Sequence, residues 1–362
     1  MRKLYLIIPI ILLIYLSCED KREESYVGVT FGGDGNDEGY SVQQTTDGGY
    51  IITGVYNHEE DNDDSDIWLI KTDSNGNKEW KRRFGDGDYD KGYGVQQTTD
   101  GGYIMIGNYN LLVKTDSEGN EEWIKNIGGR SVQQTTDGGY IIGQSSGGLL
   151  KTDSDGNEEW WNQSIDLYGG YSVQQTTDGG YIMIGHYNLV KTDSQGNVEW
   201  NRTIDGCGFC SPSVRQTTDG GYICVFGNDL VKTNSQGNEE WVKTFSSNDI
   251  GMSTISYFNS VQQTTDGGYI ITGEFRLDGY DVGLIKTDSN GNKVWIKSFN
   301  SFCTRSYNDR YCQDDGGNSV QQTTDGGYII TGFIRNTLNS SNTDIWLIKT
   351  DSKGNSKWND RQ

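Results

Sequence analysis

One hexapeptide, TTDGGY, occurs seven times along the chain and constrains its fold more than any other feature. Each copy is followed by the pattern K-T-[D/N]-S-x-G-N and then by a tryptophan. Seven complete units at irregular spacing indicate a repeat architecture, in which each unit packs against its neighbours. The tyrosines that end the hexapeptide are Tyr50, Tyr103, Tyr140, Tyr181, Tyr222, Tyr269 and Tyr328, and the tryptophans are Trp80, Trp123, Trp160, Trp200, Trp241, Trp295 and Trp358.

Each unit predicts four short strands, which we name A to D in chain order. In the first unit they are SVQQT, YIITG, IWLIKT and KEWKRRF, with D-G-G between A and B and S-N-G-N between C and D. Glycine suits such tight turns because it adopts positive φ without strain. The chain has 50 Gly and no Ala, which argues against helical domains. One such sheet cannot bury both of its faces, whereas seven arranged radially can. The sequence therefore predicts an all-β, seven-bladed β-propeller of four-stranded antiparallel blades over residues 26–362.

The repeat also resembles a known family. The unit D-G-G-Y-I-I-T-G … D-I-W-L-I-K-T-D-S-N-G-N-K-E-W is similar to the bacterial seven-bladed β-propeller repeats. Through K-T-D-S-x-G-N-x-x-W it is also similar to the tryptophan-docking units of quinoprotein-like propellers. The resemblance implies the architecture and carries over no catalytic residue. Two ways of closing the ring stay open: an N-terminal strand at residues 26–31 (YVGVTF) or a C-terminal strand at residues 356–360.

The N-terminus resembles a bacterial lipoprotein signal. Arg2 and Lys3 precede an apolar run that ends at Ser17 and Cys18, and this run is short for a membrane span. We expect residues 1–17 to be a signal peptide, Cys18 to carry lipid, and residues 18–25 to form a charged tether. An ordinary signal peptide is the alternative. The expected location is the cell envelope, outside the cytoplasm. A net charge of −21 makes nucleic acid and acidic membrane surfaces poor partners.

Five other cysteines are expected in an oxidising compartment. Cys207 and Cys210 lie in one predicted loop and Cys303 and Cys312 in another, so each pair is a candidate for a local disulfide. Cys224 lies in an apolar strand, which predicts a buried thiol. A redox or zinc role for the C-G-F-C loop is the alternative to a structural disulfide.

The predicted loops divide into a uniform set and a varied set. The A–B and C–D turns are nearly the same in every unit, whereas the B–C loops and the D-to-A links differ greatly. The longest varied segments belong to units 6, 7 and 1, which are neighbours in a closed ring, so we expect a protein or glycan partner to bind there. Arginine and tyrosine side chains suit such recognition, and the candidates are Arg276, Tyr280, Arg305, Tyr307, Arg310, Tyr311 and Arg335.

Two acidic stretches space their oxygens as calcium loops do. The candidate ligands are Asp34, Asn36, Glu38, Asp86, Asp88 and Asp90. Neither stretch has the glutamate that completes an EF-hand loop, and a solvated acidic loop is the alternative. No other cofactor is expected.

The repeated polar residues have structural interpretations as well. The Gln pairs of strand A, with Arg215 in place of the first Gln in unit 5, are expected to satisfy backbone groups of the next blade. A ring of amides that binds a polar ligand is the alternative. The seven lysines of strand C are expected to pair with carboxylates of their own unit, and the seven tryptophans to pack between blades.

Catalytic motifs are missing from the sequence. The two histidines lie in different units, and no nucleophile elbow or metal-binding histidine pair occurs. We therefore expect a monomeric binding or scaffold module and not an enzyme. A glycan-active or quinone-dependent propeller enzyme, and an envelope-assembly factor, are the alternatives.

Overall fold

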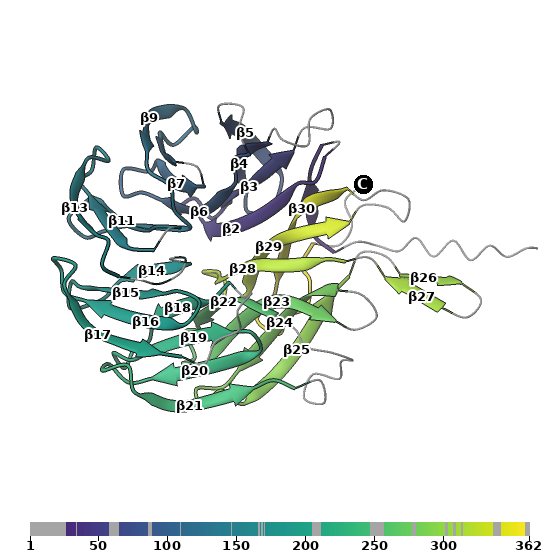
Figure 1. Ribbon diagram of the computed structural model, residues 1–362. Helices are drawn as coiled ribbons and strands as arrows, with labels where there is room; N and C mark the ends of the chain where they lie inside the picture. Colours follow the sequence, from purple (N-terminus) through teal and green to yellow (C-terminus); the bar gives the residue numbers. More distant parts are fainter. Residues whose placement is uncertain are drawn as a thin grey trace, which may run out of the picture.

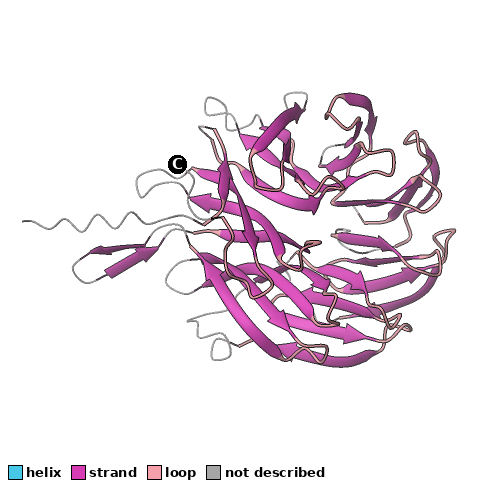
Figure 2. Ribbon diagram, turned by 180° about the vertical axis from the view of Figure 1, so that it is seen from behind, coloured by secondary structure: helices cyan, strands magenta, loops and turns pink. Residues whose placement is uncertain are grey.

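Seven four-stranded antiparallel sheets are arranged around a common centre, and the described residues form no helix (Figure 1 and Figure 2). The computed structural model describes residues 27–33, 35–57, 65–85, 89–108, 110–145, 147–165, 167, 169, 171–204, 211–246, 257–276, 280–300, 303–306, 309–312, 314–335 and 342–358. The architecture confirms the predicted seven-bladed β-propeller. No helix in this described part is long and apolar enough to cross a bilayer.

Blade 1 shows the layout that the other blades repeat. Its strands are β2 (Glu38–Gln44), β3 (Tyr50–Asn57), β4 (Ser65–Thr72) and β5 (Lys78–Phe84), hydrogen-bonded in that order. The innermost strand is A and the outermost is D. The middle strands are buried on both faces because a neighbouring blade covers each side, whereas β5 alternates between exposed and partly buried residues.

Blades 2 to 6 follow the same order from A to D. They consist of β6 (Gly92–Gln97), β7 (Tyr103–Gly107), β8 (Leu111–Thr115) and β9 (Glu121–Asn126); β10 (Ser131–Gln134), β11 (Tyr140–Gly143), β12 (Leu149–Thr152) and β13 (Glu158–Asn162); β14 (Ser172–Gln175), β15 (Tyr181–Ile184), β16 (Asn188–Thr192) and β17 (Val198–Thr203); β18 (Ser213–Gln216), β19 (Tyr222–Phe226), β20 (Asp229–Thr233) and β21 (Glu239–Thr244); and β22 (Tyr257–Gln263), β23 (Tyr269–Arg276), β24 (Tyr280–Thr287) and β25 (Lys293–Phe299).

Blade 7 closes the ring with a strand from the other end of the described chain. It combines β28 (Gly316–Gln322), β29 (Tyr328–Arg335) and β30 (Thr343–Thr350) with β1 (Val29–Phe31) as its outer strand. Val29 lies opposite Leu347 and Phe31 opposite Ile345. Of the two closures that the sequence left open, the structure has the N-terminal one.

The D-G-G turn depends on both of its glycines. In blade 1, Gly48 has φ of 85°, a value that side chains with a Cβ rarely adopt. Gly49 has no room for a side chain, because a Cβ there would lie 2.1 Å from the carbonyl oxygen of Thr72. The first glycine therefore makes the turn, and the second lets strand C approach it closely.

Each tryptophan packs against the next blade. Trp160 of blade 3 meets Tyr181 of blade 4 with ring centroids 5.8 Å apart, and a Cβ on Gly196 would lie 2.5 Å from the indole. Trp358 makes the same contacts across the closure, with Tyr50 at 5.8 Å and with Gly76 of blade 1. The predicted inter-blade role of the tryptophans is confirmed, and the resulting pockets accept only glycine in the C–D turn.

Candidate functional site

The face formed by the A–B and C–D turns repeats one ion-pair arrangement in every blade. Lys71 is 3% exposed, and its Nζ contacts Asp47 at 2.8 Å, Glu79 at 2.9 Å and the carbonyl oxygen of Thr72. In blades 6 and 7 the glutamate is absent, and Val294 and Lys357 stand at its position. The equivalent lysines are Lys114, Lys151, Lys191, Lys232, Lys286 and Lys349. The predicted pairing within each unit is confirmed, and it neutralises the lysines internally.

This arrangement predicts a loss of stability in acid. Partial burial raises the pKa of Asp47, but hydrogen bonds from Lys71, Thr45 and Gly49 outweigh burial and lower the pKa to about 2. The pKa values of Asp100, Asp219 and Asp266 are also lowered to about 2.

Because the usual value is 3.8, the unfolded chain binds more protons than the folded one in the interval between 2 and 3.8. The stabilisation is complete above that interval and is lost as the pH falls through it. We expect the urea midpoint to fall steeply there and Lys71→Met to make the dependence shallower. A midpoint that stays constant across the interval would contradict this.

The Gln pairs join neighbouring blades along the inner wall. Oε1 of Gln43 accepts the backbone N–H of Gln97 at 2.6 Å, and Oε1 of Gln97 accepts the backbone N–H of Thr46 at 2.9 Å. Corresponding bonds recur around the ring, except where Arg215 replaces the first Gln of its pair. The predicted structural role is confirmed for the oxygen of each amide. The amide nitrogen of the first Gln in each pair takes no part in these inter-blade bonds.

The inner strands enclose a cavity of about 580 Å³ at the centre of the ring. Its wall consists of residues from strand A of all seven blades, together with residues just before this strand in blades 3, 4 and 5. Among the described residues, this wall includes Arg130 and Arg215 but no Asp or Glu, in a chain with 51 acidic and 30 basic residues. The acidic residues that the structure describes therefore lie outside the cavity wall.

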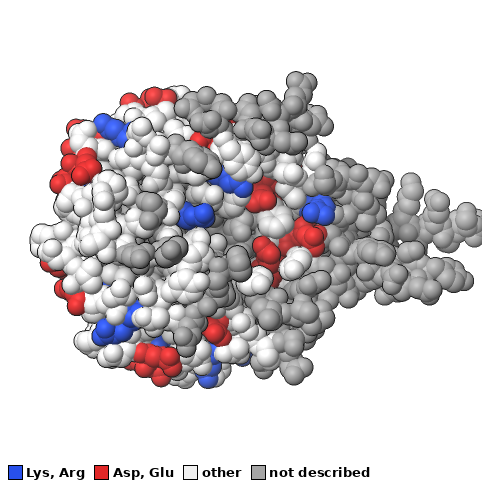
Figure 3. Space-filling model, viewed as in Figure 1, with Lys and Arg blue, Asp and Glu red and all other residues white. Residues whose placement is uncertain are grey.

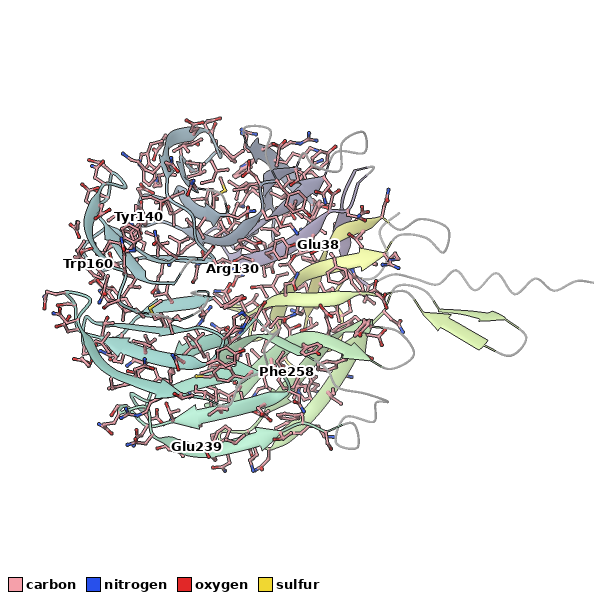
Figure 4. All side chains as sticks on the ribbon, in the orientation of Figure 1. Glu38, Arg130, Tyr140, Trp160, Glu239 and Phe258 are labelled. Atoms are coloured by element: carbon pink, nitrogen blue, oxygen red, sulfur yellow. The ribbon has the colours of Figure 1, made fainter. Side chains whose placement is uncertain are left out.

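A basic and aromatic cluster lies at the mouth of the cavity, on the face of the B–C loops. The guanidinium of Arg130 lies 4.8 Å from the ring centroids of both Tyr93 and Tyr171. The hydroxyl of Tyr171 is 2.8 Å from Nε2 of His186, and Tyr40 packs on Tyr93 at 5.2 Å. Burial, and then the charge of Arg130, lower the pKa of His186, so the imidazole is neutral at pH 7. Figure 4 shows Arg130 at the inner side of the ring.

The opposite side of the mouth is acidic. Burial, and then the charges of Glu38 and Asp314, raise the pKa of Glu274 to about 6. Figure 3 shows basic atoms near the centre of this face and acidic atoms to their right. Acidic and basic groups thus both lie around the mouth.

The structure brings together only some of the residues predicted to bind a partner in units 6, 7 and 1. Tyr280 lies opposite Arg276 where β23 meets β24, and its carbonyl oxygen accepts the backbone N–H of Asp315. Asp315 in turn accepts the backbone N–H of Arg335. These three positions therefore lie together at the junction of blades 6 and 7.

The other candidates lie on a separate hairpin, β26 (Cys303–Ser306) and β27 (Asp309–Cys312), which projects from the disc in Figure 1. Arg305 lies opposite Arg310, and Tyr311 lies opposite Thr304, while Tyr307 is outside the described residues. The register also places Cys303 opposite Cys312. No disulfide is found in the described part of the chain, Cys207 and Cys210 lie outside it, and both pairings stay predictions. Cys224 is a buried free thiol, as expected, and burial raises its pKa.

The candidate calcium ligands have structural contacts where they are described. Asn36 accepts the backbone N–H of Thr343, Glu38 accepts the hydroxyl of Tyr40, and Asp90 is buried against Ser65. Asp34, Asp86 and Asp88 lie outside the described residues. Among those that are described, no group of three His, Cys, Asp or Glu side chains could hold a metal ion. Calcium binding stays a prediction.

Sequence reasoning missed the mouth cluster, although one signal for it was present. The residue before the S-V-Q-Q segment or its equivalent varies among the units: it is Tyr in units 1, 2 and 4, Arg in unit 3, Pro in unit 5 and Asn in units 6 and 7. Seven variable positions at one place in a repeat indicate one variable ring in space.

Comparison with known proteins supports the fold. No protein-family model and no curated protein match the chain. The WD40 β-propeller domain of Doa1 is similar over 91% of this chain and 99% of its own, with a TM-score of 0.61 and 11% identity. A streptogramin B lyase is similar over 90% and 97%, with a TM-score of 0.58 and 12% identity. YCF48 bound to a D1 peptide is similar over 89% and 96%, with a TM-score of 0.57 and 11% identity. At these identities the likeness shows a shared fold, the seven-bladed β-propeller.

Proposed function

We propose that this protein is a lipid-anchored binding or scaffold module of the cell envelope. It engages a protein or glycan partner through the face that carries the B–C loops and the D-to-A links. The observation that carries this proposal is the difference between the two faces of the disc. The turn face repeats the Lys–Asp ion pair in all seven blades, while the loop face differs from blade to blade. A rigid scaffold with one variable face is the usual arrangement of a binding protein.

Related folds support a binding role. YCF48 binds a D1 peptide, and WD40 domains such as that of Doa1 share this architecture. A streptogramin B lyase shares it too, so the fold alone does not distinguish binding from catalysis. We favour binding because the sequence supplies no catalytic motif, and we infer no cofactor.

The test shortens the variable face without disturbing the sheets. Residues 301–313 and 336–341 are replaced, separately, by two-residue links such as His186-Tyr187 of blade 4. These changes spare β25, β28, β29 and β30, the strands that flank the replaced segments. Binding of the labelled protein to envelope fragments of its source organism should be lost, while the melting temperature is retained. Lys353→Gln is the control. Lys353 lies in the C–D turn, on the face opposite the variable loops, and blade 4 has Gln195 at the same position. Full binding by both shortened variants would overturn the proposal.

The anchor is tested independently of the binding face. Cys18→Ala should move the protein from the membrane fraction to the soluble fraction, because the lipid is attached to this thiol. Retention of the variant in the membrane fraction would remove the lipid anchor from the proposal and leave the binding face untouched.

A further inference from the structure

We propose that the central cavity binds an acidic sugar, with its carboxylate on Arg215 and Arg130 and its ring at the tyrosine-lined mouth. This site goes beyond the loop surface proposed above and does not depend on it. The cavity volume of about 580 Å³ lies within the range of ordinary small-molecule sites.

Two arginines line the cavity, and no carboxylate among the described residues pairs with either of them. The guanidinium of Arg215 donates from Nη1 to Oγ of Ser172 at 3.0 Å and to the carbonyl oxygen of Val214 at 2.8 Å, and both acceptors are neutral. Within the described residues, neither Arg215 nor Arg130 forms an ion pair with a carboxylate. Burial lowers the pKa of Arg215, as expected for a desolvated charge without a counter-ion. A desolvated cation is costly unless an anion accompanies it.

The two guanidinium groups contact consecutive residues of the wall. Arg130 stacks on the ring of Tyr171, and Arg215 is bonded to Ser172, the next residue in the chain. Stacking between Tyr93 and Tyr171 fixes the plane of Arg130 but leaves its N–H groups at the edge for a ligand. The proposed position of the ligand carboxylate is therefore next to residues 171 and 172, where both side chains make their contacts.

The rest of the wall offers hydrogen-bond donors. Backbone N–H groups can only donate, so the inter-blade bonds fix the first Gln of each pair with its oxygen on the next blade. Among the described residues no acceptor contacts the Nε2 groups of these amides. They belong to Gln43, Gln96, Gln133, Gln174, Gln262 and Gln321, all of which line the cavity.

Two serines of the wall are oriented in the same way. Oγ of Ser41 accepts the backbone N–H of Val95, and Oγ of Ser131 accepts that of Val173, which leaves each hydroxyl hydrogen to donate. A wall of donors around two guanidinium groups selects a ligand that is rich in oxygen acceptors and carries negative charge. Tyrosine faces at the mouth add a surface on which a sugar ring can lie. An acidic sugar combines these properties.

The experiment compares D-glucuronate with D-glucose, which differ in the carboxylate, by calorimetry on the whole protein. We expect glucuronate to bind and glucose to bind at least tenfold more weakly, the scale of one charge-assisted hydrogen bond. Arg215→Gln restores the residue found in the other six blades, so it should fold normally and should weaken glucuronate binding about tenfold or more. Arg130→Asn, which copies Asn259 and Asn318 of blades 6 and 7, should do the same.

A matched control tests whether the loss of any positive charge weakens glucuronate binding, or only the loss of a charge in the cavity. Lys78→Gln removes one exposed positive charge on β5 and should leave glucuronate affinity unchanged. Without ligand, Arg215→Gln should raise the melting temperature, because it removes an uncompensated charge. No glucuronate binding, equal binding of glucose, or full affinity in Arg215→Gln would each overturn the proposal.

A short oligomer of glucuronate distinguishes the source of the ligand. Tighter binding of the oligomer supports the end of an acidic glycan, and binding of the monomer alone supports a free sugar. Loss of envelope binding in the loop variants, with glucuronate affinity intact, would show that the two sites are separate.

Discussion

Deleting the chain up to Gly32 should lower stability more than any single substitution in a blade. The deletion removes β1, which pairs with β30 and is the outer strand of blade 7. Phe31 is 9% exposed and packs in one core cluster with Trp358, and the backbone N–H of Gly28 donates to the carbonyl oxygen of Trp358 at 3.0 Å. Losing one buried Phe costs about 3–5 kcal/mol, and the lost backbone hydrogen bonds add about 1 kcal/mol each.

That sum is comparable with the whole stability of an ordinary domain, about 5–15 kcal/mol. The deletion also leaves β30 as an unpaired edge, which favours association between molecules. We expect a melting temperature lowered by 10 °C or more, on the order expected for such a loss, together with oligomers in size-exclusion chromatography with light scattering. The control begins at Val27 and keeps β1, so it should behave as the full chain does. A monomer with an unchanged melting temperature after deletion of β1 would show that the ring closes by other contacts.

The repeated residues made the architecture predictable from sequence. The D-G-G turn, the buried lysine and the docking tryptophan depend on contacts inside one unit or with the next one. Because these contacts recur in each unit, the sequence alone indicates four strands, their order and the residues that pack between blades. Because the same local contacts recur in seven units, local sequence preference and the global fold agree.

Ring closure could not be predicted in the same way, because the contacts between the first and last strands occur only once in the molecule and not in every unit. Val29 and Phe31 pair with residues more than three hundred positions away, and the segment lacks the tryptophan that marks the other outer strands. Trp358 is supplied by the last unit instead, and it still packs on Tyr50 of blade 1. The closing sheet therefore takes its outer strand and its docking residue from opposite ends of the chain.

The cavity depends on exceptions to the repeat. Arg215 stands where six blades have Gln, and sequence reasoning interpreted this position as part of a structural ring. That interpretation holds for the six amide oxygens, but a guanidinium cannot accept a backbone N–H, so Arg215 turns to Ser172. Only the three-dimensional ring shows that Arg130, which lies 85 positions earlier in the sequence, contacts Tyr171, the residue next to Ser172. Variation within a repeat is thus the sequence signal for a site, but its partners are visible only in the structure.

Trp160→Ala should destabilise the protein strongly, whereas Trp161→Ala should be nearly neutral. The two residues are adjacent on β13, so their side chains point to opposite faces of the strand. Trp160 packs on Tyr181 and on the pocket at Gly196, while Trp161 is 43% exposed. Truncating a packed Trp costs about 3–5 kcal/mol, and an exposed one about 0.5 kcal/mol. Urea unfolding of both variants measures the difference.

A second substitution tests the same contact on the side of blade 4, at Gly196. Gly196 has φ of 79°, and its added Cβ would lie 2.5 Å from the indole of Trp160. Gly196→Ala should therefore lose stability through strain and through displacement of the indole. In the double variant with Trp160→Ala, part of that loss should disappear, because the indole is no longer there to be displaced. Equal losses for Trp160→Ala and Trp161→Ala, or strict additivity with Gly196→Ala, would show that the blades are held together by the strands alone and not by tryptophan docking.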